Sequence, residues 1–243
     1  MHTRWVAMLY SLNTYPLHRF VAAYRLSISQ PHKRAATVLS MLMVIITTSI
    51  VLTTPAFAAS KQATVLVLGD SLSAAYKIPL KQGWVSLLRQ QLNTNSSTQY
   101  HVVNASVSGE TSAGGLARLP QLLSLHQPDI VIIELGGNDG LRGYPLKTLQ
   151  QNLTTMVTLS EQAQAKVLLL GIQIPPNYGK RYTQGFKQVY PAVASKMEVA
   201  LVPFFLEGVA LKRELMLTDG IHPNAKAQPL LTQTVWEYLA QLL

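Results

Sequence analysis

The stretch Ala63-Thr64-Val65-Leu66-Val67-Leu68, followed directly by Gly69-Asp70-Ser71-Leu72-Ser73, decides how this chain folds. Its first half is almost continuously apolar, which is typical of a strand covered on both faces of a sheet. Four more runs of this kind lie at residues 100–104, 129–135, 166–172 and 199–204. The chain therefore offers five candidate strands.

Amphipathic segments alternate with these runs. They occupy residues 84–92, 116–125, 146–163, 186–197 and 228–243. Alternation of strand and helix implies right-handed crossovers and a parallel sheet held between helices. The sequence therefore predicts a single α/β domain with a five-stranded parallel sheet.

Three glycine-bearing turns follow the first three predicted strands, at residues 69–71, 104–109 and 136–139. The carboxyl ends of parallel strands share one edge of the sheet, so we expect these turns to form a cradle there. One such turn is weak support, because tight turns need glycine in any case. Three turns at neighbouring strand ends indicate a functional site.

Ser71 stands at the tip of the first strand, and Asp219 and His222 lie three residues apart near the other end of the chain. A serine, an imidazole and an acid together turn a hydroxyl into a nucleophile. Asp219 can accept from Nδ1–H of His222 and leave Nε2 free to face Ser71. Two plainer interpretations stay open: Ser71 as a helix N-cap, and Asp219-Gly220 as an ordinary turn.

His222 is also the histidine that remains by elimination. Three of the six histidines precede residue 59. His101 begins the second predicted strand, and His126 with Asp129 lies at the start of the third, so all three belong to the opposite edge of the sheet. The sequence therefore predicts Ser71 as nucleophile, His222 as general base and then acid, and Asp219 as the group that orients the imidazole.

Acyl transfer also needs hydrogen-bond donors for the tetrahedral oxyanion. The candidates are the backbone N–H groups of Ser71 and Gly109 and the side-chain amide of Asn138. We expect Asp70 and Asp139 to organise the loops by accepting backbone hydrogen bonds. No cluster with metal-ligand spacing occurs, so neither a metal nor another cofactor is expected. The G-x-S-x-G elbow and the Walker loop are also missing.

These residues resemble the blocks of the SGNH (GDSL-type) hydrolase family. The matching positions are Ser71 in Gly-Asp-Ser-Leu, Gly109, Asn138 in Gly-Gly-Asn-Asp, and Asp219-x-x-His222. Longer stretches, such as Glu134-Leu135-Gly136-Gly137-Asn138-Asp139-Gly140-Leu141-Arg142-Gly143, are most similar to the periplasmic multifunctional thioesterases, lysophospholipases and arylesterases of Gram-negative bacteria. The resemblance runs through essentially all of residues 59–243.

The resemblance implies a flavodoxin-like three-layer α/β/α sandwich. It implies hydrolysis of aryl esters, acyl-CoA and lysophospholipids through an acyl-enzyme on Ser71, and small-molecule acyl esters and thioesters as partners. It also implies a loop at residues 140–145 beside an acyl groove, with Leu141, Ile174 and Pro175 as substrate-binding residues. The plainer interpretation of these three is packing.

Residues 1–58 have the layout of a secretory signal peptide. Five Lys and Arg and no acid precede residue 35, residues 35–52 are uncharged and mostly apolar, and Ala56-Phe57-Ala58 is a small-residue cleavage pattern. We expect cleavage between Ala58 and Ala59, a hydrolase domain over residues 59–243, and export to the periplasm or beyond. The alternative is an uncleaved anchor, since 18 apolar residues reach the lower limit for a spanning helix.

The net charge limits the classes of partner that this chain can bind, and the cysteine content limits its chemistry. Residues 59–243 carry 15 Lys and Arg against 11 Asp and Glu, a net charge of +4, whereas the whole chain carries +9. The basic residues are scattered, so no nucleic-acid partner is expected, although a weak positive charge can favour transient contact with membrane lipid. The chain has no cysteine, which excludes disulfides and thiolate catalysis. We expect a monomer.

Two other functions remain open at this level. The first is a carbohydrate or peptidoglycan O-acetylesterase on the same fold, which would need no apolar groove beside Ser71. The second is a lipid-binding module without catalysis, which the complete set of site residues disfavours.

Overall fold

Five parallel strands form one sheet in the order β2-β1-β3-β4-β5. The structure is a computed structural model that describes residues 62–95 and 98–243; the predicted signal peptide, residues 1–58, lies outside them. The strands are β1 (Gln62–Gly69), β2 (Gln99–Asn104), β3 (Ile130–Glu134), β4 (Lys166–Leu170) and β5 (Ala200–Val202). The predicted five-stranded parallel sheet is confirmed, and its strand order is the flavodoxin-like one.

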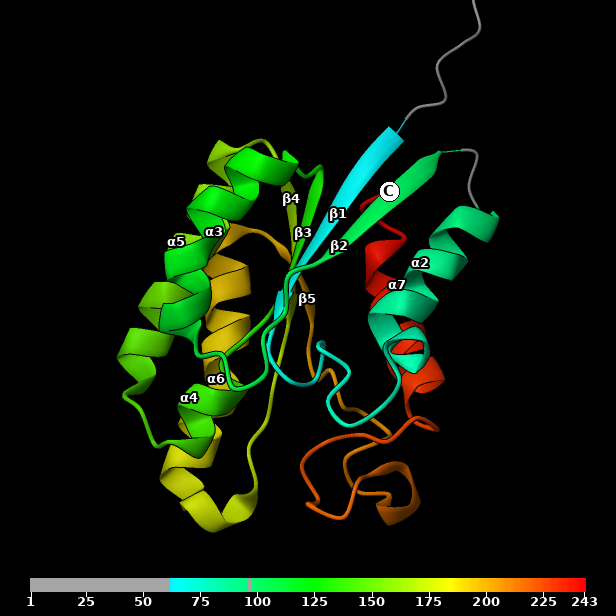
Figure 1. Ribbon diagram of the computed structural model, residues 1–243. Coiled ribbons are helices and arrows are strands. Elements are labelled where there is room, and N and C mark those ends of the chain that lie inside the picture. The colour runs from blue at the N-terminus through cyan, green and yellow to red at the C-terminus, as the bar shows by residue number, and fades with distance from the viewer. Residues whose placement is uncertain (1–61, 96–97) are drawn as a thin grey trace, which may run out of the picture. The chain divides into compact units, whose positions relative to one another are not determined.

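Helices cover both faces of this sheet. They are α2 (Trp84–Asn95), α3 (Ser112–His126), α4 (Gly137–Leu141), α5 (Leu146–Gln162), α6 (Lys180–Met197) and α7 (Gln228–Leu239), with short 3-10 turns η1 (Leu80–Gln82), η2 (Pro176–Tyr178) and η3 (Arg213–Leu215). In Figure 1, α2 and α7 lie together on one face, and α3, α5 and α6 pack side by side on the other. The fold is therefore the expected three-layer sandwich.

The core lies on both faces of the central strands. Residues 65–68 of β1 and 130–133 of β3 are buried throughout, as expected for parallel strands sandwiched by helices. On the α2 side, Trp84 and Phe205 meet edge to face with ring centroids 5.4 Å apart. This packing fixes β1 and β3 side by side, with Val65 opposite Ile130.

Most observed elements differ from the predicted ones by a few residues at their ends, and three of the differences have a clear physical reason. Strand β5 has only three residues because Pro203, which follows it, has no N–H to continue the ladder. Helix α6 begins six residues before the predicted start, since its first turn is polar and exposed. Helix α4 was not predicted, because five residues are too few to show a helical pattern.

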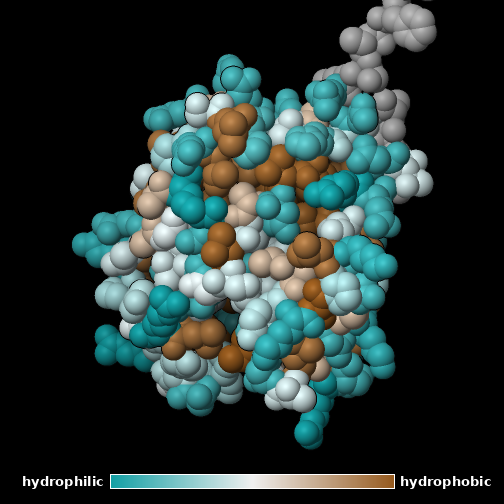
Figure 2. Space-filling model, viewed as in Figure 1, coloured by the Kyte–Doolittle hydropathy of each residue, from teal (hydrophilic) through white to brown (hydrophobic). Residues whose placement is uncertain are grey.

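The surface of the domain is mixed in character. In the view of Figure 2, hydrophilic residues are interspersed with separate hydrophobic patches. Within residues 62–95 and 98–243, no helix combines the length and the apolar composition needed to cross a bilayer.

Candidate active site

The turn after β1 presents Ser71 at the carboxyl edge of the sheet. The chain leaves β1 toward β2 on one side, while β3 lies on the other, so this edge is the point where the strand order reverses. Gly69 makes the turn possible, because a Cβ there would lie 2.7 Å from Ser73 Oγ and 2.9 Å from Glu134 Oε2. Ser71 therefore sits in the crevice where sheets of this kind bind ligands.

A hydrogen-bonded chain runs from Ser71 to His222 and Asp219. His222 Nε2 lies 2.8 Å from Ser71 Oγ, and His222 Nδ1 lies 3.0 Å from Asp219 Oδ2. The His222 side chain is 18% exposed and that of Asp219 is 31% exposed. The structure thus brings the three sequence-predicted residues together. In this geometry Asp219 fixes the Nδ1–H tautomer, and Nε2 can take the proton of the serine hydroxyl.

Asp219 is stabilised as a carboxylate. Burial opposes its ionisation, but the backbone N–H groups of His222 and Ile221, each 3.0 Å from Asp219 Oδ1, together with the His222 ring, outweigh burial and lower the pKa of Asp219 to about 2. The turn formed by these bonds also places the imidazole. Asp219 is therefore both an ordinary turn residue and the partner of His222.

Tyr76 covers the His222 ring. The two ring centroids lie 4.4 Å apart with the planes tilted by 38°, and Lys77 Nζ lies 5.0 Å from the centre of the tyrosine ring. Ala75 and Lys77, on either side of Tyr76, both have left-handed backbone angles, with φ of 57° and 55°. Such angles are costly for residues with a Cβ, so this loop is held in an unusual conformation beside the imidazole.

Three N–H donors at this edge remain available to a ligand. Asn138 donates one amide hydrogen to Asp70 Oδ2 at 2.9 Å, which leaves its second hydrogen free. Among the described residues, the backbone N–H groups of Ser71 and Gly109 donate to no other group. Gly109 has a φ of 81°, which suits glycine, and Arg142 Nη2 donates to its carbonyl at 3.1 Å.

Two buried carboxylates tie the loops to the core. Asp70 Oδ1 accepts from the backbone N–H of Leu72 at 3.0 Å, and Asp139 Oδ2 accepts from that of Ser112 at 2.8 Å. Asp139 Oδ1 also accepts from Ser112 Oγ at 2.6 Å. The prediction that these acids organise the loops is confirmed.

The predicted substrate-binding residues have different surroundings. Ile174 is buried under α4, where a Cβ on Gly140 would lie 2.6 Å from its Cγ2. Leu141 is half-buried, and its carbonyl accepts from Tyr178 Oη at 3.0 Å. Pro175 is exposed. Their role toward a substrate stays a prediction.

Sequence reasoning missed two residues of this site. Tyr76 was not singled out, because a tyrosine in a turn carries no pattern. Glu134 was counted as part of a strand, yet it is fully buried and accepts from Ser73 Oγ at 2.7 Å. A charged residue in an otherwise apolar strand was the signal available, since buried glutamates are rare.

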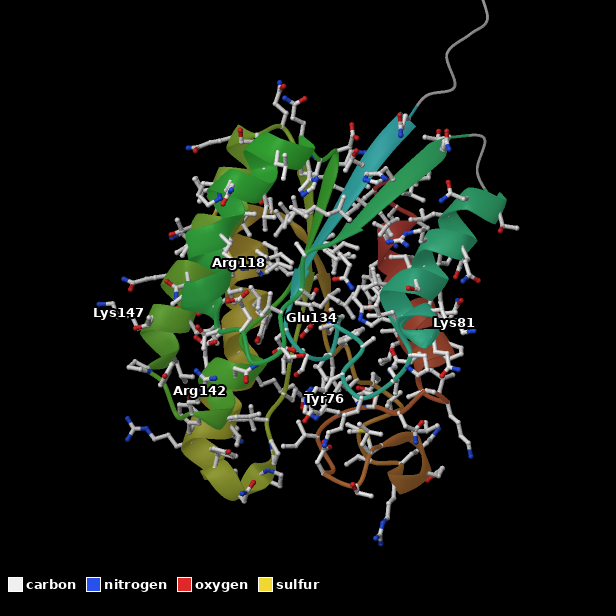
Figure 3. All side chains as sticks on the ribbon, in the orientation of Figure 1. Tyr76, Lys81, Arg118, Glu134, Arg142 and Lys147 are labelled. Carbon is white, nitrogen blue, oxygen red and sulfur yellow. The ribbon has the colours of Figure 1, made fainter. Side chains whose placement is uncertain are left out.

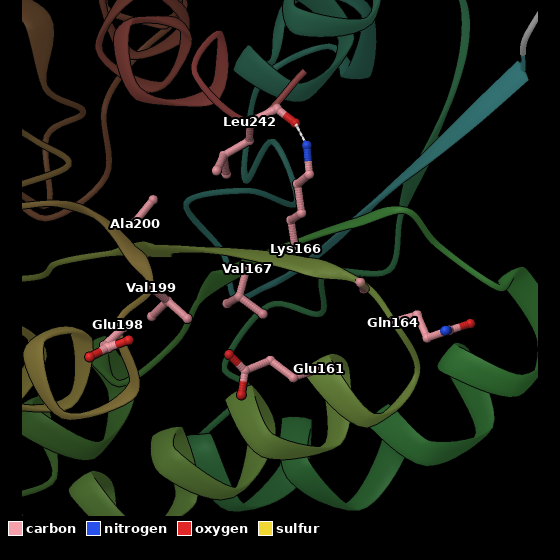
Figure 4. Close-up of a pocket in the computed structure, with 9 residues that line it drawn as sticks. Glu161, Gln164, Lys166, Val167, Glu198, Val199, Ala200 and Leu242 are labelled. Atoms are coloured by element: carbon pink, nitrogen blue, oxygen red, sulfur yellow. Dashed lines mark hydrogen bonds between the residues drawn. The ribbon is translucent and has the colours of Figure 1, made fainter.

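Two hollows lie at the other edge of the sheet. One hollow, of about 400 Å³, is lined by the start of β4 and the ends of α5 and α6, and includes Glu161, Lys166 and Glu198 (Figure 4). Asp129 is at this edge too, where it accepts from the Thr64 backbone N–H at 2.7 Å. In the part of the chain that the structure describes, no three His, Asp or Glu side chains are grouped to hold a metal ion.

Known proteins resemble this chain over most of its described part. Residues 67–229 match the sequence profile of the GDSL-like lipase/acylhydrolase family. Esterase TesA of Pseudomonas aeruginosa is 57% identical over 180 residues, which cover 74% of this chain and 89% of TesA. The crystal structure of TesA superimposes with a TM-score of 0.72 and covers 74% of this chain and 99% of that one.

Two further relatives are similar over the same part. An arylesterase of Vibrio mimicus is 49% identical over 178 residues, or 73% of this chain and 88% of that protein. The thioesterase 1/protease 1/lysophospholipase L1 of Escherichia coli K12 is 46% identical over 187 residues, or 77% of this chain and 88% of that protein.

The low pKa of Asp219 predicts a pH dependence of stability. Because the folded-state pKa of about 2 lies below the ordinary 3.8, ionised Asp219 stabilises the fold above about pH 4, and this contribution is lost as the pH falls through about 2. Urea unfolding of the wild type and D219N should therefore give a free-energy difference that shrinks between these two values. A difference that stays constant over this range would contradict the assignment.

Proposed function

This chain belongs to the GDSL-like lipase/acylhydrolase family, and from that premise we propose that it is a serine hydrolase of carboxylic esters and thioesters. Aryl esters, acyl-CoA and lysophospholipids are the substrates to expect, since its relatives are named esterase, arylesterase, thioesterase and lysophospholipase. The observation that carries the proposal is the chain of hydrogen bonds from Asp219 through His222 to Ser71.

The reaction begins when Ser71 Oγ attacks the acyl carbon and His222 Nε2 takes the hydroxyl proton. The carbonyl oxygen becomes an oxyanion, for which Asn138 and the backbone N–H groups of Ser71 and Gly109 are the donors. Asp219 favours the imidazolium that forms. The intermediate collapses, the bond to the leaving oxygen or sulfur breaks, and His222 gives its proton to that atom.

The second half of the reaction repeats the first with water. His222 takes a proton from water as its oxygen attacks the acyl group on Ser71. The ester bond to Ser71 breaks, the proton returns to Ser71 Oγ, and the carboxylic acid leaves. The site needs no bound cofactor for either step.

We propose that the residues upstream of the described part are an export signal. We expect residues 1–58 to direct secretion, with the enzyme working in the periplasm as a monomer in transient contact with membrane lipid. The mass of the protein recovered from a periplasmic extract should correspond to a chain that begins at Ala59. Recovery of the uncut chain from the membrane fraction would instead support an anchor.

Substitution of the nucleophile tests the mechanism. We expect S71A to lower kcat for p-nitrophenyl butyrate by at least about 10⁴-fold, and to abolish labelling by a serine-directed phosphonate. N138A should lower kcat by about 10²–10³-fold with little change in KM, because an oxyanion donor acts mainly in the transition state.

The exposed serine near the end of α3, Ser124, supplies the matched control. S124A should keep wild-type turnover and labelling, and circular dichroism should show that all three variants are folded. An S71A protein that still turns over or still takes the phosphonate would show that another residue is the nucleophile.

Acyl-chain length separates this proposal from an O-acetylesterase. Val107 and Ile221, beside Gly109 and His222, are large apolar side chains exposed at 47% and 40%. Contact of an acyl chain with such side chains contributes about 0.8 kcal/mol per CH₂ that it buries. We therefore expect a higher kcat/KM for p-nitrophenyl octanoate than for the acetate. The reverse order would favour the O-acetylesterase.

A further inference from the structure

Glu134 is the most deeply buried acid near the candidate site. It ends β3, the middle strand of the sheet, and Figure 3 places it at the centre of the molecule between the two helix layers. Its side chain is 0% exposed. Oε2 accepts from Ser73 Oγ at 2.7 Å and from the backbone N–H of Asp70 at 3.3 Å. The mechanism above does not use this group.

A second buried acid lies in contact with the first. Asp70 is 2% exposed, its backbone N–H donates to Glu134 Oε2, and the charge of its carboxylate adds to burial in raising the pKa of Glu134. Among residues 62–95 and 98–243, no Lys or Arg forms an ion pair with either acid. Burial beside a second negative charge, with no cation to pair it, favours the protonated form of Glu134.

The contacts of Glu134 indicate where that proton resides. Oε2 takes both donors and behaves as a carbonyl oxygen, whereas Oε1 is buried and accepts a hydrogen bond from no described group. As a bare carboxylate oxygen, Oε1 would be a buried acceptor with no donor. If it carries a proton, it becomes a hydrogen-bond donor instead. Burial raises the pKa of Glu134 well above its ordinary value, and it raises that of Asp70 to about 6. At Asp70 the hydrogen bonds from Leu72 and Asn138 oppose the effect of burial, so the proton is favoured on Glu134.

Asp70 accepts hydrogen bonds that require its ionised carboxylate form. Oδ1 accepts from the Leu72 backbone N–H, and Oδ2 accepts from Asn138 Nδ2 at 2.9 Å. A carboxylate can accept from Leu72, Asn138 and Glu134 at once. A protonated Asp70 would present a hydrogen to one of these donors and turn the Asn138 amide away from its present orientation.

We propose that Glu134 is kept as a neutral acid and is a positioning residue for the oxyanion site, because it donates to the Asp70 carboxylate that orients Asn138. The inference rests on the proposed function, in which Asn138 is an oxyanion donor. Glu134 touches no reacting atom. Its effect passes through Asp70 to Asn138, and through Ser73 to the turn that carries Ser71.

Tyr190 and His222 interact electrostatically with this pair, and Asp139 lies close to Tyr190. Tyr190 is buried and donates to the Leu135 carbonyl at 3.0 Å, and burial together with the nearby acids raises its pKa well above the ordinary value. Asp139 is held by Ser112. A positive charge on His222 favours the ionised form of Asp70. When His222 accepts the serine proton, the Asp70 carboxylate is therefore stabilised further.

Two variants of Glu134 test the proposal. E134Q keeps a carbonyl oxygen for Ser73 and an N–H donor for Asp70, whereas E134M keeps only the bulk. We expect E134Q to retain kcat within about threefold, and E134M to lower kcat by roughly 10- to 100-fold with little change in KM, as for a buried hydrogen bond left unmade. In the N138A background the effect of E134M on kcat should largely vanish, because both changes act through the same donor.

Infrared spectroscopy supplies a readout that does not depend on activity. The wild type at neutral pH should show the C=O stretch of a buried protonated carboxylic acid, and the difference spectrum against E134Q should lose it. Absence of this band overturns the proposal, as does an E134Q protein as slow as E134M. If E134M fails to fold, the infrared band and the kcat of E134Q still test the proposal. Failure of the proposed function would appear separately, as turnover that survives in S71A.

Discussion

The hydrogen bond between His222 Nε2 and Ser71 Oγ joins two residues 151 positions apart, and the rest of the site depends on it. It requires the last loop of the chain to return across the carboxyl edge of the sheet to the end of β1. A bridge between Met216 and Pro223 and a bond from the Leu217 N–H to the His222 carbonyl, 2.7 Å long, close this loop. Gln228, at the start of α7, then accepts from the Trp84 backbone N–H at 3.0 Å. The loop that carries the imidazole is thus fixed by backbone contacts within it and by the Gln228 side chain, which reaches the core at Trp84.

Asp219 and Glu134 differ in ionisation state because their surroundings differ. Asp219 is partly exposed and accepts two backbone hydrogen bonds, so its ionised form is favoured and its pKa is low. Glu134 is fully buried beside another carboxyl group, so its neutral form is favoured. Environment alone separates their roles: one acid supplies charge to an imidazole, and the other supplies a hydrogen-bond donor without charge.

Much of the fold was predictable because the information is local. Continuous apolar runs identify strands buried on both faces, and the rule that reactive residues gather at the carboxyl edge places Ser71 and Asn138 together. Elimination among the six histidines then identifies His222. Contacts set by tertiary packing were not predictable. The stacking of Tyr76 on His222 depends on left-handed angles at Ala75 and Lys77, for which non-glycine residues give no sequence signal. The pairing of Glu134 with Asp70 depends on the register between β1 and β3.

The proposed oxyanion donors are available because other groups satisfy the neighbouring hydrogen bonds. Ser71 lies in the turn after β1 and Asn138 lies in α4, and Asp70 anchors both: the turn through the Leu72 N–H and the helix through the Asn138 amide. The loop that carries Gly109 is anchored at its end by Asp139. Buried carboxylates thus accept from one set of donors, and the backbone N–H groups of Ser71 and Gly109 donate to no described group. Preorganisation of this kind requires acids that stay buried without disrupting the core, which a shared proton between Asp70 and Glu134 makes possible.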